Sequence, residues 1–405
     1  MQESNIVVGL DIGTSKVACI VAERGGDGNL AVIGLGTHPS YGLKKGVVVD
    51  IQSTIQAIRL AVEEAELMAD VHINQVCVGV AGSHIWSCNS QGVVAIENSQ
   101  VSDDDVKRVI DAAHAWQMPD NKKIIHVIPQ HYKLDSLEGV RNPVGMHGTR
   151  LEAQVHMITG DNFAIQNIVS CCHKCDLDVS HLVLEQIASS ESVLSEDEKD
   201  IGVLMVDIGG GTTDLAVYKQ GYLCHTSVIP IGGDHLTNDL AAGLKISTKE
   251  ADRLKVKYGC CVTAMISNDD VVEVRYVGDR EPSKVPRQVL AQFLEPRMIE
   301  LFNLIREELM NFRFMEHLSA GVVLTGGSSL LEGSQQLAEE AFEFPVRIGR
   351  PKGLGGLLDV VNSPIYATGV GLVKYSRKFN KDDNIKSKRV GMKSLFQKVL
   401  TWFGV

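Results

Sequence analysis

Apolar residues follow two alternating patterns along the chain, short unbroken runs and longer stretches with helical spacing. The unbroken runs predict buried strands at residues 6–10, 76–80, 202–206 and 321–324. The helical spacing predicts helices at residues 51–69, 162–172, 189–194 and 295–313, the last with Pro296 marking its start. Strands that alternate with helices are typical of an α/β fold.

A near-repeat divides the chain into two similar halves. Near the start, an apolar run leads into Asp11-Ile12-Gly13-Thr14-Ser15-Lys16 and a second apolar run. In the second half, another pair of apolar runs flanks Asp207-Ile208-Gly209-Gly210-Gly211-Thr212-Thr213-Asp214. Each copy predicts a β-hairpin with a glycine-rich turn, and the repetition predicts two related domains that face each other.

The two turns have the composition of phosphate-binding loops. Consecutive glycines can present several backbone N–H groups to one anion, and the hydroxyls of Thr14, Ser15, Thr212 and Thr213 add donors. Lys16 adds a positive charge, and Asp11 and Asp207 end their strands where both could hold a phosphate-bound Mg²⁺ in a shared cleft. A single copy could be only a tight hairpin; two matched copies favour a nucleotide site.

A third glycine turn follows the strand at 321–324, in Thr325-Gly326-Gly327-Ser328-Ser329. Paired glycines let the backbone approach a flat ligand, and we expect a helix capped by Ser328 or Ser329 to follow. The alternative is an ordinary strand-to-helix turn. The chain has no GxxxxGK[ST] segment, so this is not a Walker loop.

Composition and charge exclude several classes of protein. With 44% hydrophobic and 22% charged residues, the chain can bury a large core. It lacks an apolar run long enough to span a membrane, and its first residues do not look like a signal peptide, so we expect a cytosolic protein. The net charge of −11 argues against nucleic-acid binding. Cys171, Cys172 and Cys175 with His173 could form a metal knuckle, but reduced thiols in a helix fit better.

The basic C-terminal end differs from the acidic remainder. Residues 378–388 are polar and charged and predict a linker. A helix over 388–403 would gather its apolar side chains on one arc of about 160°: Met392, Leu395, Phe396, Val399, Leu400, Trp402 and Phe403. Such a helix behind a basic linker predicts an anchor on an anionic membrane surface. The alternative is a terminal helix docked on the protein's own core.

The three glycine turns, in this order, resemble those of the actin, hexokinase and heat-shock chaperone ATPase superfamily. Within it, the chain resembles the FtsA family of bacterial cell-division proteins over essentially its whole length. The residues that carry this likeness lie in a segment rich in strands and turns: 126–132 (HVIPQHY), 142–146 (NPVGM), 150–152 (RLE) and 155–160 (VHMITG).

The resemblance implies an actin-like ATPase fold of class α/β, with two related domains around a nucleotide cleft and an FtsA-type inserted subdomain. We expect subdomain 1A at 1–83 and 359–377, the inserted subdomain 1C at 84–162, subdomain 2A at 163–232 and 302–358, and subdomain 2B at 233–301. A linker at 378–388 and a membrane-targeting helix at 389–405 would follow.

The same resemblance assigns further residues. It implies that Gly232 and Gly233 line the cleft and that Asp252 and Lys255 lie near ribose and adenine, with Asp252 standing where the superfamily has Glu. Glu185 corresponds to a glutamate that positions water in relatives, although a surface glutamate is the alternative. Residues 366–371 resemble the second interdomain helix, and the alternative is a plain buried helix.

The implied function is that of an ATP-binding protein with at most slow hydrolysis. It would polymerise on the cytoplasmic face of the inner membrane at the division site, and it would tether FtsZ through the FtsZ C-terminal tail and contact other division proteins. Arg297 would bind a carboxylate of that tail; its alternative is an intrahelical ion pair with Glu300. Alternative functions are a pilus-assembly scaffold, a small-molecule kinase or a chaperone ATPase of the same superfamily.

Overall fold

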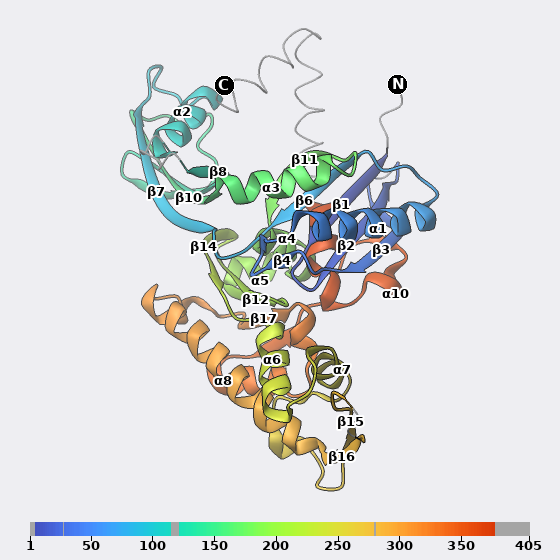
Figure 1. Ribbon diagram of the computed structural model, residues 1–405. Helices are drawn as coiled ribbons and strands as arrows, with labels where there is room; N and C mark the ends of the chain where they lie inside the picture. The colour runs from blue at the N-terminus through green and yellow to red at the C-terminus, as the bar shows by residue number, and fades with distance from the viewer. Residues whose placement is uncertain (1–4, 27, 115–120, 279–280, 377–405) are drawn as a thin grey trace.

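The computed structural model describes residues 5–26, 28–114, 121–278 and 281–376 (Figure 1). The predicted linker and the predicted amphipathic C-terminal helix lie outside these residues. Among the helices that the structure describes, none combines the length and the apolar character needed to cross a membrane.

The first half of the core is a six-stranded sheet in the order β11-β6-β1-β2-β3-β19. Its strands are β1 (Ile6–Ile12), β2 (Lys16–Arg24), β3 (Leu30–Pro39), β6 (Gln75–Val80), β11 (Asp178–Leu184) and β19 (Gly355–Gly356). The helices α1 (Ile51–Ala69) and α3 (Asn162–His173) cover one face, and a helix over residues 367–376 packs on the other. The unbroken apolar strands follow from this burial on both faces.

The second half is a five-stranded sheet in the order β14-β13-β12-β17-β18. Its strands are β12 (Val203–Ile208), β13 (Thr213–Lys219), β14 (Tyr222–Ile229), β17 (Val322–Thr325) and β18 (Val346–Ile348). One face carries α4 (Glu185–Val193), and the other carries α6 (Gly233–Leu244), α8 (Arg287–Asn311) and α9 (Ser334–Phe342). Both expected hairpins form, because β1 pairs antiparallel with β2 and β12 with β13.

The remaining elements form two additions to this core. A four-stranded sheet, called here the inserted sheet, contains β7 (Trp86–Ala95), β8 (Lys122–Leu134), β9 (Leu137–Val140) and β10 (Arg150–Asp161), with α2 (Asp103–His114) packed against it. It lies beside β14. The second addition contains α7 (Thr248–Tyr258), β15 (Val271–Val274) and β16 (Ser283–Pro286), which lie next to α6 and α8 at the opposite end of the structure (Figure 1).

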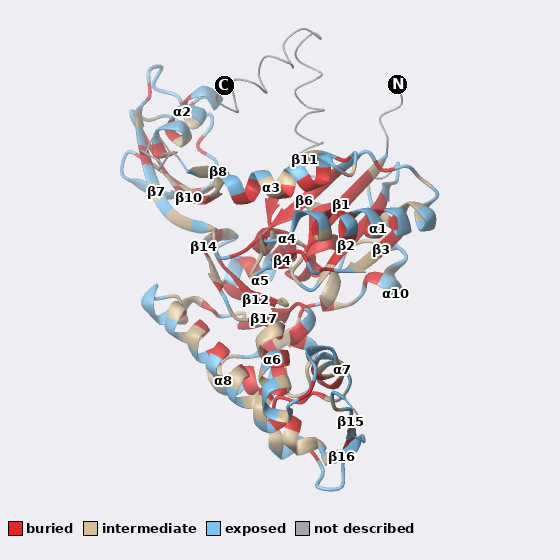
Figure 2. Ribbon diagram, in the orientation of Figure 1, coloured by how far each residue is buried: buried red, intermediate tan, exposed pale blue. Residues whose placement is uncertain are grey.

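The shorter elements of the described residues include β4 (Leu43–Lys44), β5 (Val47–Val48), α5 (Glu196–Ile201) and α10 (Leu358–Val361). Buried residues concentrate on the strands of the two core sheets and on the inner sides of the helices (Figure 2). Cys171 and Cys172 are part of this core, buried on the inner side of α3.

Two expectations about helix ends were wrong. Helix α8 begins at Arg287, and Pro296 lies inside it, because apolar contacts of Leu290, Leu294 and Met298 hold the helix together across the missing N–H group. Ser328 and Ser329 do not cap an α-helix; they belong to a 3₁₀ turn (Gly327–Leu330), and α9 starts later with Gly333 as its N-cap.

Candidate nucleotide site between two glycine turns

The glycine turns of the two hairpins lie in direct contact. A Cβ on Gly211 would lie 2.7 Å from Oγ1 of Thr14, and a Cβ on Gly210 would overlap the hydroxyl of Ser15. The turn of one hairpin therefore packs its hydroxyls onto the bare backbone of the other. Glycine is required here for close approach, since any side chain would force the two turns apart.

Two aspartates are buried where these hairpins meet. Asp11 and Asp207 are the last residues but one of β1 and β12, and their exposed fractions are 6% and 8%. Nζ of Lys16 lies 3.4 Å from Oδ2 of Asp11. Asp207 instead accepts hydrogen bonds from the hydroxyls of Ser189 (2.6 Å) and Thr368 (3.4 Å). The two predicted carboxylates thus share one buried region.

The acidic groups in this region influence each other's protonation. Burial raises the pKa of Asp207 to about 6, and the negative charge of Asp11 adds to this rise. Burial and the charge of Asp207 raise the pKa of Asp214 to about 8. The pKa of Glu185 rises well above its usual value through burial and then through Asp11, Asp214 and Asp207. Negative charge accumulates here beyond what Lys16 compensates.

Asp214 closes the second motif without a role that the sequence reveals, and the structure gives it one of the most buried positions in the site. Its Oδ1 accepts a hydrogen bond of 2.7 Å from Nε2 of Gln186, and its Oδ2 accepts one of 3.1 Å from Thr212. Gln186 itself is fully buried on α4, next to Glu185. Gln186 and Asp214 lie in different elements, so no local sequence pattern indicates this pairing.

The start of α6 forms the third wall. Gly232 and Gly233 approach the second hairpin closely enough that the N–H of Gly233 donates to the carbonyl of Gly209 at 2.9 Å. Nζ of Lys255 donates to the carbonyl of Gly233 (3.1 Å) and to Thr237 (2.7 Å), and it pairs with Asp252 (2.9 Å). The expected ribose and adenine residues therefore lie beside the glycine turns, and Asp252 is the exposed member.

The third glycine turn borders the same region. Gly326 has a φ of +81°, and a Cβ there would overlap Oδ1 of Asp207. The hydroxyl of Ser328 donates to the carbonyl of Gly209 at 3.4 Å, while Gly327 is exposed. The third turn is thus adjacent to the cation-binding candidate Asp207 as well as to the second hairpin.

Among the residues that the structure describes, no three His, Cys, Asp or Glu side chains are arranged to hold a metal ion by themselves. A site formed by two carboxylates and a phosphate needs no such triad, since Mg²⁺ usually keeps several waters and takes one or two protein ligands.

Comparison with known proteins shows the family to which this chain belongs. A family model described as "Cell division protein FtsA" matches residues 204–371, and a model described as "SHS2 domain inserted in FTSA" matches residues 82–159. The chain is 50% identical to the cell division protein FtsA of Pseudomonas aeruginosa over 93% of this chain and 90% of that protein. The chain belongs to the FtsA family.

A second relative supports this membership, and solved structures support the fold. The FtsA of Escherichia coli is 42% identical over 93% of this chain and 91% of its own length. The type IV pilus PilM–PilN complex matches with a TM-score of 0.68 at 17% identity, covering 92% of this chain and 98% of the other. MreB5 of Spiroplasma citri bound to ADP matches with a TM-score of 0.57 at 14% identity, covering 95% and 99%.

These findings confirm the expected fold and class of protein. The chain is an actin-like cell-division protein with the nucleotide-binding fold of the FtsA family, and the inserted sheet coincides with the SHS2 match. The pilus-complex likeness, at 17% identity, is a likeness of fold alone.

Arg297 is remote from the glycine turns, on α8 of this FtsA-family protein. Its guanidinium binds both carboxylate oxygens of Asp239, with Nε 2.7 Å from Oδ2 and Nη2 3.1 Å from Oδ1. It also pairs with Glu300 one helical turn away, as the alternative interpretation expected. The stronger partner, Asp239 on α6, was not recognisable from sequence spacing.

Three further groups in the site were not predicted from the sequence. Ser189 and Thr368 hold Asp207, and the N–H of Gly46, in the turn between β4 and β5, donates to Oγ1 of Thr14 at 3.3 Å. Ser189 and Thr368 come from the two helices that pass between the halves, so no local motif connects them to Asp207.

Proposed function

We propose that this protein binds Mg²⁺–ATP between its two hairpins, assembles into actin-like filaments at the division site, and tethers FtsZ to the inner membrane. The observation that supports this most is the contact between the two glycine turns, with Asp11 and Asp207 buried beside them, in a chain of the FtsA family. The MreB5 structure, which has the same fold, is bound to ADP.

The residues present fit a magnesium ion. Asp11, Asp207, Asp214 and Glu185 bring four carboxyl groups together, and the pKa values of Asp207 and Asp214 are raised first by burial and then by neighbouring carboxylates. Asp11 and Asp207 would hold a divalent cation, which would offset the repulsion between these carboxylates. When bound, it would also neutralise developing charge on the phosphates.

The protein's own groups would hold the nucleotide on three sides. Phosphates would contact the backbone and hydroxyls of Gly13, Thr14, Ser15, Gly209, Gly210, Gly211, Thr212 and Thr213, with Lys16 adding charge. The adenosine would lie toward Gly232, Gly233, Asp252, Lys255, Gly326, Gly327 and Ser328. These groups come from both halves, so the nucleotide would bias the angle between them.

Glu185 is our candidate for positioning the attacking water. A general base must be ionised, and the raised pKa of Glu185 opposes ionisation until a cation reduces the surrounding negative charge. This arrangement fits slow hydrolysis that depends on Mg²⁺. Glu185→Gln should reduce phosphate release and leave ATP affinity unchanged.

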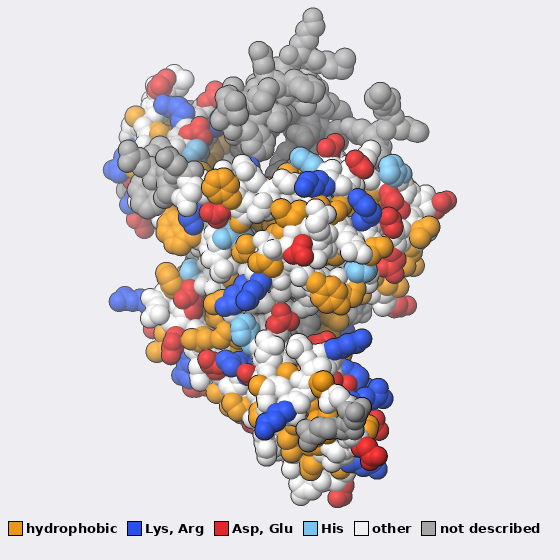
Figure 3. Space-filling model, in the orientation of Figure 1, with side chains coloured by type: hydrophobic (Ala, Val, Ile, Leu, Met, Phe, Trp, Pro, Cys, Tyr) orange, Lys and Arg blue, Asp and Glu red, His pale blue; other side chains and the backbone are white. Residues whose placement is uncertain are grey.

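Membrane attachment would come from Met392, Leu395, Phe396, Val399, Leu400, Trp402 and Phe403. Their apolar arc would enter the interface of the inner membrane, and the neighbouring lysines would face anionic headgroups on its cytoplasmic side. Over the described face in Figure 3, acidic and basic side chains are interspersed, and the whole chain has a net charge of −11. We therefore do not propose nucleic acid as a partner.

The membrane proposal is tested by adding one negative charge to either side of this helix. In the whole chain, Leu400→Glu places the charge on the apolar arc of the helix, whereas Gln397→Glu places it on the polar side of the same helix. In co-sedimentation with anionic vesicles, with and without ATP, we expect loss of binding for Leu400→Glu alone. Equal sedimentation of both variants and the parent protein would contradict the anchor.

FtsZ recruitment would use α8, where Arg297 would exchange Asp239 for a carboxylate of the FtsZ C-terminal tail. The exposed Ile299 nearby offers an apolar contact. Arg306 on the same helix provides a control, because nine residues at about 100° each place it on the opposite side. Arg297→Glu should weaken binding of the tail peptide, whereas Arg306→Glu should not; equal affinity for both variants would remove Arg297 from the docking site.

A further inference from the structure

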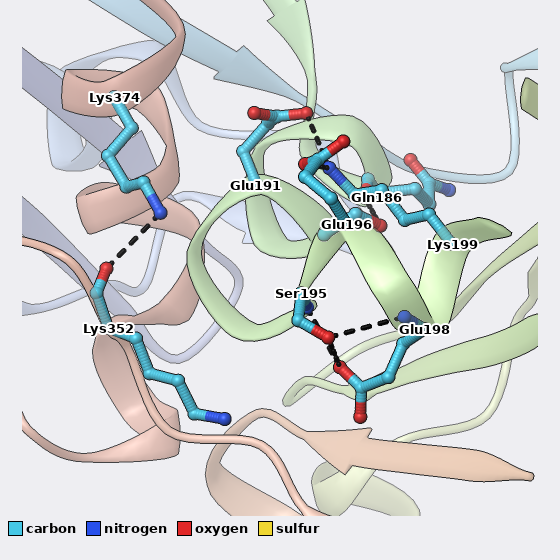
Figure 4. A network of polar contacts seen from close by, with 9 residues as sticks. Gln186, Glu191, Ser195, Glu196, Glu198, Lys199, Lys352 and Lys374 are labelled. Carbon is cyan, nitrogen blue, oxygen red and sulfur yellow. Dashed lines mark hydrogen bonds and ion pairs between the residues drawn. The ribbon is translucent and has the colours of Figure 1, made fainter. Parts of the chain in front are cut away.

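Two helices that lie between the two core sheets cross each other beside the candidate cation site. They are α4 and the helix over residues 367–376. A Cβ on Gly371 would overlap the carbonyl of Ala188, so the two backbones touch, and the hydroxyl of Ser192 donates to the carbonyl of Ala367 at 2.7 Å. Figure 4 shows the helix that carries Lys374 beside the helix that carries Gln186 and Glu191.

Each crossing helix also contributes one hydroxyl to Asp207. The hydroxyl of Ser189 donates to Oδ2 at 2.6 Å, and that of Thr368 donates to the same oxygen at 3.4 Å. The two hydroxyl oxygens lie 3.0 Å apart. Ser189 is fully buried, and Thr368 and Asp207 are buried as well, so water does not substitute for these contacts.

The 367–376 helix lies against the other aspartate-bearing strand as well. A Cβ on Gly9 of β1 would lie 2.7 Å from the carbonyl of Gly369, and a Cβ on Gly369 would lie 3.9 Å from Cβ of Asp11. One helix therefore touches both strands that end in the buried aspartates. A change in its angle to α4 would alter the relative position of Asp11 and Asp207.

We propose that Ser189 and Thr368 are positioning residues that connect the charge at Asp207 to the crossing of the two interdomain helices. This inference rests on the proposed binding of Mg²⁺–ATP. A serine hydroxyl has one proton to donate, so Ser189 donates to Asp207 or to Thr368 but not to both at once. A hydrogen bond to a charged carboxylate is about twice as strong as one between neutral groups.

The direction of the coupling follows from that choice. While Asp207 carries uncompensated charge, Ser189 and Thr368 both point their protons at Oδ2 and hold the helices to the second half. A cation on Asp207 weakens its hold on these protons, and the Ser189–Thr368 bond between the helices then becomes the better alternative. The cation thereby changes the contacts across the helix crossing.

Ser192 supplies a matched control. Its hydroxyl joins the same two helices through the carbonyl of Ala367 and also lies 2.9 Å from the carbonyl of Ser189, so its hydrogen bonds go to backbone rather than to Asp207. Ser189→Ala, Thr368→Val and Ser192→Ala are made in the full-length protein, and Thr368→Ser restores the hydroxyl in case Thr368→Val impairs folding. Two measurements are made: the Mg²⁺ concentration for half-maximal binding of a fluorescent ATP analogue, and amide hydrogen exchange of residues 367–376 with ATP, in Mg²⁺ or in EDTA.

We expect Ser189→Ala and Thr368→Val to lower the Mg²⁺ requirement by roughly tenfold, because each removes a hydrogen bond that is stronger while Asp207 is without its cation. Both should abolish the Mg²⁺-dependent difference in exchange of residues 367–376, and Thr368→Ser should restore it. Ser192→Ala should speed exchange equally in Mg²⁺ and EDTA and leave the Mg²⁺ requirement unchanged.

Two results overturn the inference. If Ser189→Ala and Thr368→Val behave like Ser192→Ala while the parent protein binds nucleotide in a Mg²⁺-dependent way, the hydroxyls are only structural and the proposed function stands. If the parent protein itself shows no Mg²⁺-dependent nucleotide binding, the proposed function and this inference fail together.

Discussion

The two halves of the core begin from the same hairpin but hold their buried aspartates differently. In the first half, Asp11 has a cation beside it, Lys16, from its own hairpin. In the second half, Asp207 has neutral hydroxyl partners, Ser189 and Thr368, from the interdomain helices. One aspartate is thus paired with a charge from its own hairpin, and the other is hydrogen-bonded to two helices that pack between the halves.

The second half is also joined to the inserted sheet at its edge. The edge strand β14 of the second sheet is held by side chains of the inserted sheet: Ser87 donates to the carbonyl of Thr226 (2.8 Å) and Gln130 to that of Leu223 (2.9 Å). His156 bridges Asn89 (2.7 Å) and Thr226 (3.0 Å). Side chains of the inserted sheet therefore satisfy the carbonyls of Leu223 and Thr226 on this edge strand, in place of a further strand.

The largest effect should come from the charge that distinguishes the first hairpin. Lys16→Ala removes the cation from the phosphate loops and should weaken ATP binding by a factor of roughly 10 to 100, the value of one charge-assisted hydrogen bond. Lys219→Ala, at the end of β13, serves as the control. Fluorescence titration with an ATP analogue measures both, and equal affinities would mean that the hairpins do not divide their roles in this way.

The next prediction compares two glycine-to-alanine changes, one within the first half and one at the contact between the halves. A Cβ on Gly36 would overlap the carbonyl of Ala61 inside the first half, and one on Gly371 would overlap that of Ala188 between the halves. Each glycine-to-alanine change should lower the free energy of unfolding by about 1–3 kcal/mol in denaturant titrations.

Only Gly371→Ala should also reduce the nucleotide-dependent change in hydrogen exchange at residues 367–376. Gly26→Ala is the control, since nothing lies within 4 Å of its added Cβ. A nucleotide response lost equally in Gly36→Ala would show that the crossing of the helices has no special role.

A smaller effect concerns the contact between β14 and the inserted sheet. Burial, and then the charge of His225, lowers the pKa of His156 from 6.5 to about 3. The unfolded chain therefore binds a proton below pH 6.5 that the folded protein does not, so stability falls as the pH decreases from 6.5 toward 3.

Between pH 6.5 and 5.5 this contribution amounts to about 1 kcal/mol. We expect His156→Asn, which cannot titrate, to lose that much less stability over the same interval in chemical denaturation. Identical pH dependence of the two proteins would mean that His156 is protonated within the folded contact.

The smallest effect should come from the exposed ion pair at the same junction. Arg141 and Asp200 lie 3.1 Å apart with most of both side chains in solvent. Arg141→Ala should change the free energy of unfolding by less than about 0.5 kcal/mol. A larger loss, measured by thermal or denaturant unfolding, would show that surface charge, rather than the buried hydrogen bonds, stabilises this junction.

Local patterns were sufficient for the hairpins and for most helices. The sequence predicted the glycine turns after Asp11 and Asp207, the long helix after residue 50 and the strand before Gly326. These elements depend on the backbone preferences and burial of residues that are neighbours in the sequence. The start of α8 and the cap expected at Ser328 were wrong, since contacts of Leu290 and Leu294 and the 3₁₀ turn depend on neighbours distant in the sequence.

What the sequence alone determined was the repeated hairpin, the glycine turns and the family to which they belong, because turn chemistry and strand burial act over a few residues. The tertiary structure decided which groups surround each aspartate. Ser189 and Thr368 reach Asp207, Gln186 reaches Asp214, and Asp239 reaches Arg297 only after the halves and the helices pack. Hydrogen bonds and buried charges depend on distance in space, and short sequence spacing cannot encode contacts made across the fold.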